Sequence, residues 1–220
     1  MQTDTGSSKN LSLSEAGAVK PTLAERIWDF SWNEVLPRPI GTKGVIMTRE
    51  PFDEIATFAA THFERIFEIE NRDNPFLNNE PSGYKERYYR ETADIFGYRL
   101  DGELIGVTLS EPLDWNSYHV RHHSVLEKFQ GLGITQGFLN EVVIPELKKL
   151  NVKRIQIETS PANLPVIQIL TRLRFNITGT VLSERWGANL CMTKFLDPRN
   201  ESVFLEQFCF GNHPQAKNSS

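Results

Sequence analysis

Apolar residues recur at two spacings along the chain, one typical of β-strands and one typical of α-helices. Each spacing persists only over a short segment. In the middle, Ile95 to Leu100 and Glu103 to Leu109 are β-prone runs separated by Asp101-Gly102. An Asp-Gly pair readily adopts the positive φ values of a tight type I′ turn, so these two runs predict a β-hairpin.

The other segments alternate between strand-like and helix-like patterns. After the hairpin, Tyr118 to Leu126 is β-prone, and Gln136 to Leu150 carries apolar residues at helical spacing. Such an order favours a mixed α/β fold. The further segments are a strand at Gly44 to Thr48 before a helix from Phe52 to Ile66, a strand at Lys153 to Thr159, a helix at Leu164 to Arg174, and pairing strands at Ile177 to Leu182 and Leu190 to Phe195.

Length and composition indicate a single domain. The chain has 220 residues and a mass of 25.2 kDa, and 39% of its residues are hydrophobic. That is enough for one sizeable core and short for two. Residues 1–20 and 211–220 contain little to bury, so we expect flexible ends around a domain at 21–210.

Charge and cysteine content exclude several partners. Twenty-four basic against 28 acidic residues give a formal net charge of -4, which argues against nucleic-acid binding. The sequence has neither a long apolar run nor a signal-peptide pattern, so we expect no membrane association and a cytoplasmic location. Cys191 and Cys209 match no metal or redox spacing, and we expect no metal.

The segment from Phe129 to Thr135 lies between a predicted strand and a predicted helix and contains Gly131 and Gly133. Free N–H groups at a helix start, with the positive end of the helix dipole, bind phosphate. A tight turn without a ligand is the alternative. Neither a Walker A sequence nor a complete GxGxxG motif is present, which argues against nucleotide hydrolysis and hydride transfer.

The loop resembles the (Arg/Gln)xxGx(Gly/Ala) acyl-CoA motif of the Gcn5-related N-acetyltransferase (GNAT) superfamily. Gln130 and Gly133 match the motif, and Thr135 departs from its final small residue. Val125 matches the apolar strand end five positions earlier. Further along, Asn163 and Phe175 match the family's later signature, whereas Val166, Leu170 and Arg174 depart from it.

This resemblance implies a single-domain GNAT fold, with a mixed, mostly antiparallel sheet, a splayed central strand pair and flanking helices. It also implies acetyl-CoA or another acyl-CoA as co-substrate, with the pantetheine arm between the splayed strands. Its pyrophosphate would lie on the loop, and Asn163 near the thioester. The implied cofactor-binding residues are His123, Ser124, Val125, Gln130, Gly131, Leu132, Gly133, Ile134, Thr135 and Asn163.

Catalytic residues are less clearly indicated, because Leu170 occupies the position of the family's usual tyrosine acid. Tyr118, His122 and Ser124 alternate along one strand and would share a face, where a histidine could act as a base. Glu158 is a second candidate base. Structural roles are equally compatible with these residues. Arg185, with Trp32, Trp115 and Trp186, could line an acyl or acceptor cavity.

Three functions are compatible with this pattern. The first is transfer of acetyl or another short acyl group from CoA to an amine of a small molecule or peptide. The second, favoured by Leu170, resembles the GNAT loading domains of polyketide synthases, which decarboxylate malonyl-CoA and load an acyl carrier protein by S-acetyl transfer. The third is an acyl-CoA-binding module without catalytic activity.

Overall fold

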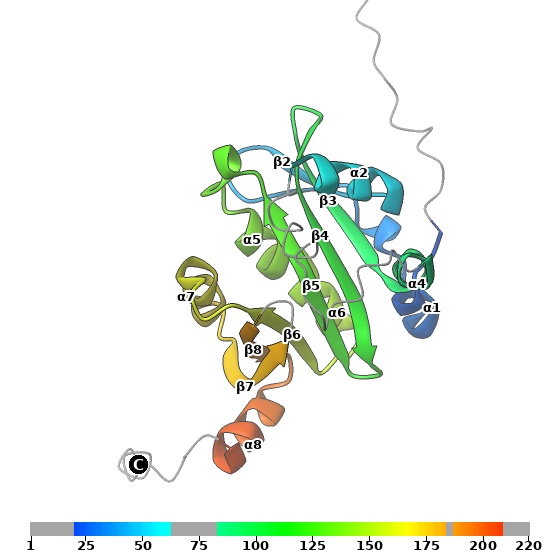
Figure 1. Cartoon of the computed structure of the whole chain (residues 1–220). Coiled ribbons are helices and arrows are strands. Elements are labelled where there is room, and N and C mark those ends of the chain that lie inside the picture. Colours follow the sequence, from blue (N-terminus) through cyan, green and yellow to red (C-terminus); the bar gives the residue numbers. More distant parts are fainter. Residues whose placement is uncertain (1–19, 63–82, 184–186, 209–220) are drawn as a thin grey trace, which may run out of the picture.

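The computed structural model describes residues 20–62, 83–183 and 187–208, which form one open sheet with helices on both faces (Figure 1). The strand order is β1-β2-β3-β4-β5-β6-β8-β7, and β5 with β6 is the parallel pair among otherwise antiparallel neighbours. The predicted mixed, mostly antiparallel sheet is thus confirmed. The strands are β1 (Arg38–Ile40), β2 (Val45–Arg49), β3 (Asp94–Leu100), β4 (Glu103–Asp114), β5 (Ser117–Val125), β6 (Arg154–Thr159), β7 (Asn176–Ser183) and β8 (Gly187–Phe195).

The helices frame this sheet. Helices α2 and α7 and the helix formed by α5, η5 and α6 match predicted segments, with ends shifted by a few residues. They are α1 (Leu23–Trp28), η2 (Trp32–Glu34), α2 (Phe52–His62), α4 (Gly83–Thr92), η4 (Glu127–Phe129), α5 (Ile134–Gln136), η5 (Gly137–Val143), α6 (Ile144–Lys149), α7 (Leu164–Arg172) and α8 (Pro198–Phe208).

The central hairpin has the predicted turn. Asp101 and Gly102 have φ values of 51° and 85°, as a type I′ turn requires. Strand β4 continues to Asp114, beyond the predicted end at Leu109, because its second half pairs with β5. Tertiary pairing therefore extends a strand whose sequence pattern had already become polar.

The helix after the glycine loop is continuous from Ile134 to Lys149, although its middle third, η5, has π-helical hydrogen bonding. Pro145 follows this segment. Proline has no N–H to donate, and its ring crowds the carbonyl one turn earlier. A local π segment accommodates this crowding without breaking the helix.

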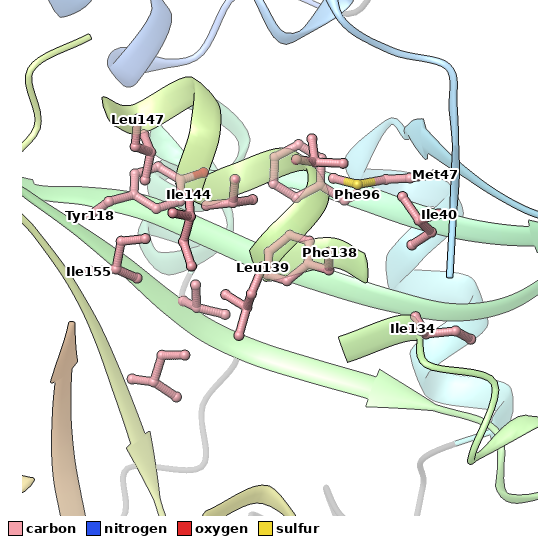
Figure 2. Packing of buried hydrophobic residues seen from close by; sticks show 14 of the residues in the cluster. Ile40, Met47, Phe96, Tyr118, Ile134, Phe138, Leu139, Ile144, Leu147 and Ile155 are labelled. Carbon is pink, nitrogen blue, oxygen red and sulfur yellow. The ribbon is translucent and has the colours of Figure 1, made fainter. Parts of the chain in front are cut away.

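The main hydrophobic core lies between the sheet and the helix formed by α5, η5 and α6 (Figure 2). Phe138, Leu139 and Leu147 of this helix pack against Phe96 and Tyr118 of the sheet. A smaller cluster on the opposite face joins α2 to β3 and β4. The labelled members of the main core in Figure 2 also include Ile40, Met47, Ile134, Ile144 and Ile155.

Six elements were not predicted: α1, η2, β1, α4, η4 and α8. Helix α1 has only six residues, too few for a visible apolar period. It begins with a capping box, in which Glu25 N–H donates to Thr22 and Thr22 N–H donates to the Glu25 carboxylate at 2.6 Å. Local capping and tertiary packing, rather than periodicity, specify this short helix.

A buried polar cluster, here called the Asp94 cluster, attaches α1 to the sheet. Thr22 Oγ1 donates to Asp94 Oδ1 at 2.5 Å, and Tyr118 OH donates to Asp94 Oδ2 at 2.7 Å. Arg49 forms an ion pair with Glu25 and lies 4.0 Å from Asp94 Oδ1. All five side chains of the cluster are buried or almost completely buried. The cluster therefore places charged groups inside the fold.

Burial raises the pKa of Asp94 to about 6, although hydrogen bonds from Thr22 and Tyr118 oppose the shift. The folded protein therefore binds this proton more tightly than the unfolded chain between about pH 4 and pH 6, and stability falls as the pH rises through that window. Asp94→Asn removes this titrating carboxyl group. The difference in unfolding free energy, wild type minus variant, should therefore decrease by roughly 3 kcal/mol between pH 4 and pH 7. Denaturant titrations across this range would measure it, and a constant difference would contradict the assignment.

Candidate functional site

The parallel strands β5 and β6 separate partway along their length, and this region is here called the fork. Their pairing runs from Ser117 with Arg154 to Val120 with Ile157 and then ends. Beyond it, β5 continues to Val125 and pairs only with β4, while β6 continues to Thr159 and pairs only with β8. Figure 1 shows the two strands diverging toward α5 and α7. One edge of each strand is thus left without a strand partner.

A β-bulge lies at the fork and corrects one prediction. Val120 pairs with Ser110 and His122 pairs with Leu109, so Arg121 is an extra residue in β5. The extra residue reverses the alternation of side chains. Tyr118 therefore faces the main core, while His122 and Ser124 face the opposite side. The expectation that all three share a face was wrong.

The glycine loop presents unpaired backbone N–H groups close to the fork. Gln130 N–H donates to Glu127, and Gly137 N–H donates to Gly133 at 2.8 Å. Between them, no protein acceptor is found within the described part of the chain for the N–H groups of residues 131–135. Gly131 and Gly133 have φ values of 81° and 75°, which favour glycine. A helix start with such free donors is suited to an anion.

The turn between β1 and β2 supports this loop from behind. A Cβ atom at Gly41 would lie 2.8 Å from the carbonyl oxygen of Leu132, and one at Gly137 would lie 2.8 Å from the Gly41 nitrogen. The two chain segments therefore touch through backbone atoms. Sequence reasoning missed Gly41, since nothing in a local pattern shows contact with a segment about 90 residues away.

His123 connects the sheet to the first turn of α5. Its Nε2 lies 2.9 Å from Thr135 Oγ1, and its Nδ1 lies 2.7 Å from Thr108 Oγ1 and 3.3 Å from Tyr98 OH. The ring stacks on Phe138, and burial lowers its pKa to about 4, so the imidazole is neutral at physiological pH. The side chain of His123 is thus a loop anchor.

This arrangement also explains the threonine at the final position of the loop motif. The Thr135 hydroxyl bonds to His123 on the sheet, so its side chain faces inward. The Gln130 side chain folds back in a similar way, and its Nε2 donates to Val125 O at 3.4 Å. Backbone rather than side-chain groups of the loop therefore remain for a ligand.

Glu158 and His122 lie on the sheet face opposite the main core. Glu158 follows Ile157, the last residue of β6 that pairs with β5, and it is exposed. It pairs with Cys191 on β8. Burial, together with the nearby Glu158 carboxylate, raises the pKa of the Cys191 thiol. The fold thus brings two of the candidate bases to one face beside the fork.

Other predicted residues lie elsewhere or contribute packing. Tyr118 OH bonds to Asp94 in the core, and Trp32 is 1% exposed between aromatic rings. Trp115 lies at the β4–β5 turn, the end of β5 opposite the glycine loop. Leu170 is buried in the main core, while Asn163 is exposed at the start of α7. The predicted Arg185 and Trp186 lie outside the described residues.

No group of three or more histidine, cysteine, aspartate or glutamate side chains suited to a metal ion is found in the ranges that the structure describes. Within the same ranges, no helix is long and apolar enough to span a membrane.

Comparisons with known proteins agree with this geometry. The family model described as "Acetyltransferase (GNAT) family" matches residues 63–175. RimJ of Mycobacterium smegmatis, solved in complex with CoA-disulfide, is 15% identical, with a TM-score of 0.53 over 73% of this chain and 88% of that one. An IAA acetyltransferase from Bacillus cereus ATCC 14579 is 13% identical, with a TM-score of 0.50 over 69% and 99% of the two chains.

The ribosomal-protein-S18-alanine N-acetyltransferase of Escherichia coli is 14% identical, with a TM-score of 0.50 over 70% of this chain and 94% of that chain. At these identities the likeness shows a shared fold. The comparison with curated proteins finds no match.

Proposed function

Because the chain belongs to the GNAT acetyltransferase family and is therefore a GNAT-type acyltransferase, we propose that it transfers acetyl or another short acyl group from acyl-CoA to an amine. The acceptor amine belongs to a small molecule or a peptide. Within this proposal, acyl-CoA lies in the fork, with its pyrophosphate on the glycine loop.

The observation that carries the proposal is the free edge of β5 beside a loop with unpaired N–H groups. Residues 122–125 leave one backbone edge without a strand partner, and residues 131–135 follow directly after a short turn. A pantetheine arm contains amide groups that can pair with a strand edge, as an added β-strand does. A diphosphate suits the helix start. RimJ of Mycobacterium smegmatis, which shares this fold, was solved with a CoA derivative.

The leaving group needs little help from an acid in this proposal. Leu170 is 1% exposed in the main core, so its position supplies packing and cannot donate a proton. A thiol has a pKa near 8.5, so its thiolate leaves more readily than an alkoxide would. The bases Glu158 and His122 remain the candidates for removing a proton from the amine, because both lie beside the fork.

Two measurements on the purified full-length chain test the proposal. Calorimetry with acetyl-CoA should give a saturable binding curve, and mass spectrometry should detect enzyme-dependent CoA release with a panel of primary amines and peptides. Absence of acetyl-CoA binding would contradict the proposal. Conversion of malonyl-CoA to acetyl-CoA without an amine would instead support the decarboxylating alternative, whose acceptor is an acyl carrier protein.

The hydrogen bond between Thr135 and His123 predicts a moderate loss of affinity in the same binding assay when it is removed. Thr135→Val keeps the side-chain volume and removes the hydroxyl that bonds to His123. Loss of one buried hydrogen bond costs about 1 kcal/mol, so we expect roughly fivefold weaker acetyl-CoA binding. Thr57→Val on α2 is the matched control, because that hydroxyl bonds only to its own helix. Equal affinities of the two variants would show that the anchor does not position the loop.

A further inference from the structure

A row of polar side chains crosses three neighbouring strands on the sheet face opposite the main core. Glu111 of β4 pairs with His119 of β5, and His119 pairs with Gln156 of β6. Directly paired residues share a face, so the three side chains form one continuous row, here called the acceptor row. It lies one residue before Val120 and Ile157, the last β5–β6 pair at the fork.

The acceptor row contains unsatisfied hydrogen-bonding atoms. Among the described residues, six buried side-chain N or O atoms have no hydrogen-bond partner, and three of them are Glu111 Oε2, His119 Nδ1 and Gln156 Oε1. Glu111 is 3% exposed and His119 is 8% exposed. His119 Nδ1 lies 3.8 Å from Glu111 Oε1, beyond hydrogen-bond distance, so the two oxygens are the atoms without any close polar contact. Buried polar atoms in native proteins nearly always have partners, so these oxygens indicate that the row can receive a hydrogen-bond donor.

The charge of the row identifies the ligand's chemistry. Although burial acts to raise the pKa of Glu111, His119 and Arg121 lower it more, so this carboxylate is ionised at neutral pH. Glu111 Oε2 and Gln156 Oε1 can only accept hydrogen bonds, while His119 Nδ1 faces the Glu111 carboxylate. A primary ammonium offers three donors and a positive charge, whereas an anion would be repelled.

Arg121 lies beside the row and pairs with Glu111. Its Nη1 donates to Glu111 Oε1 at 2.9 Å, and its guanidinium lies 5.4 Å from the centre of the Tyr89 ring on α4. The Arg121 side chain is 40% exposed, unlike the Glu111 carboxylate that it covers. It can therefore move into solvent without disturbing the core and leave room beside Glu111.

We propose that Glu111, His119 and Gln156 form the subsite that binds the ammonium group of the acceptor, with Arg121 as its movable cover. This inference rests on the proposed acyl transfer, because the subsite's function depends on its position beside the fork. Beyond the amine acceptor already proposed, it names the side chains of this chain that hold the acceptor's ammonium group.

The test uses n-butylammonium chloride as the probe and the ring signals of His119 as the readout. The full-length protein, with histidine rings labelled, is titrated in 150 mM salt, and His119→Gln assigns the signal. We expect a saturable shift with n-butylammonium and none with 1-butanol. No saturable shift with the ammonium, or an equal shift with the alcohol, would overturn the subsite.

Variants separate the carboxylate from general charge effects. Glu111→Gln should weaken n-butylammonium binding at least tenfold, while Asp114→Asn, which removes an exposed carboxylate from the same strand, should change it less than twofold. Equal losses in the two variants would overturn the assignment. If Glu111→Gln does not fold, Arg121→Gln serves as the deciding variant. Removal of the competing Arg121 cation should tighten n-butylammonium binding several-fold. Unchanged or weaker binding would overturn the subsite.

Acetyl-CoA binding, measured on the same samples, separates this inference from the proposed function. Wild-type protein that binds acetyl-CoA without responding to n-butylammonium would overturn the subsite alone. Protein that responds to n-butylammonium without binding acetyl-CoA would overturn the proposed acyl transfer, and with it the assignment of the ammonium to an acceptor.

Discussion

Gly133→Glu should weaken acetyl-CoA binding at least 100-fold. The substitution places a carboxylate at the helix start, where the diphosphate of acyl-CoA is proposed to bind, and the two negative charges would repel each other. It also forces a side chain onto a residue with a φ of 75°, which displaces the neighbouring N–H groups. Calorimetric titration with acetyl-CoA measures the effect.

Gly102→Glu is the matched control for this substitution. Gly102 has a φ of 85° at the tip of the central hairpin, and a Cβ atom there would meet nothing within 4 Å. It therefore experiences the same backbone strain and the same change of net charge away from the loop. Comparable binding losses in both variants would show that strain or net charge, and not the loop, accounts for the result.

Arg49→Met should destabilise the fold by about 3–5 kcal/mol, because it leaves Glu25 and Asp94 buried without their cation. The Arg49 side chain is 4% exposed, so water cannot replace it. The pKa of Asp94 is already raised to about 6, and its protonation at lower pH would remove one uncompensated charge. We therefore expect the loss measured by denaturant titration to be smaller at pH 5 than at pH 7.5.

The comparison is Arg154→Met, which removes an ion pair that is open to solvent on both sides. Arg154 binds Asp114, and the two side chains are 41% and 42% exposed. Ion pairs near the surface contribute roughly 1 kcal/mol or less, so this variant should be clearly milder. A similar loss for both arginines, or a loss at Arg49 that does not depend on pH, would contradict the described electrostatics of the Asp94 cluster.

Local sequence chemistry was enough to predict the central elements. The Asp101-Gly102 turn, the helix after the glycine loop and the β7–β8 pair all follow from turn propensity and apolar spacing, and each is present. The family resemblance, which rested on Gln130, Gly133 and the register of Val125, is confirmed by the family model. These signals are local and therefore readable from one sequence.

Contacts between distant segments could not be predicted in the same way. The inserted residue at Arg121 becomes visible only when β5 is paired with β4, and it changes which side chains face the proposed acceptor. The acceptor row itself joins residues from three strands, of which Glu111 and Gln156 are 45 positions apart. Tyr118 was predicted beside the chemistry because regular alternation was assumed, and the bulge removes that assumption.

The bulge in β5 determines which of two adjacent histidines faces the glycine loop. With Arg121 inserted, His123 faces the helix and holds the glycine loop, while His122 faces the side of the acceptor row. If Arg121 instead took part in a regular ladder, alternation would exchange these two positions. The identity of the anchor and of the side chain beside the acceptor is thus set by the pairing register as well as by the chemistry of the residues.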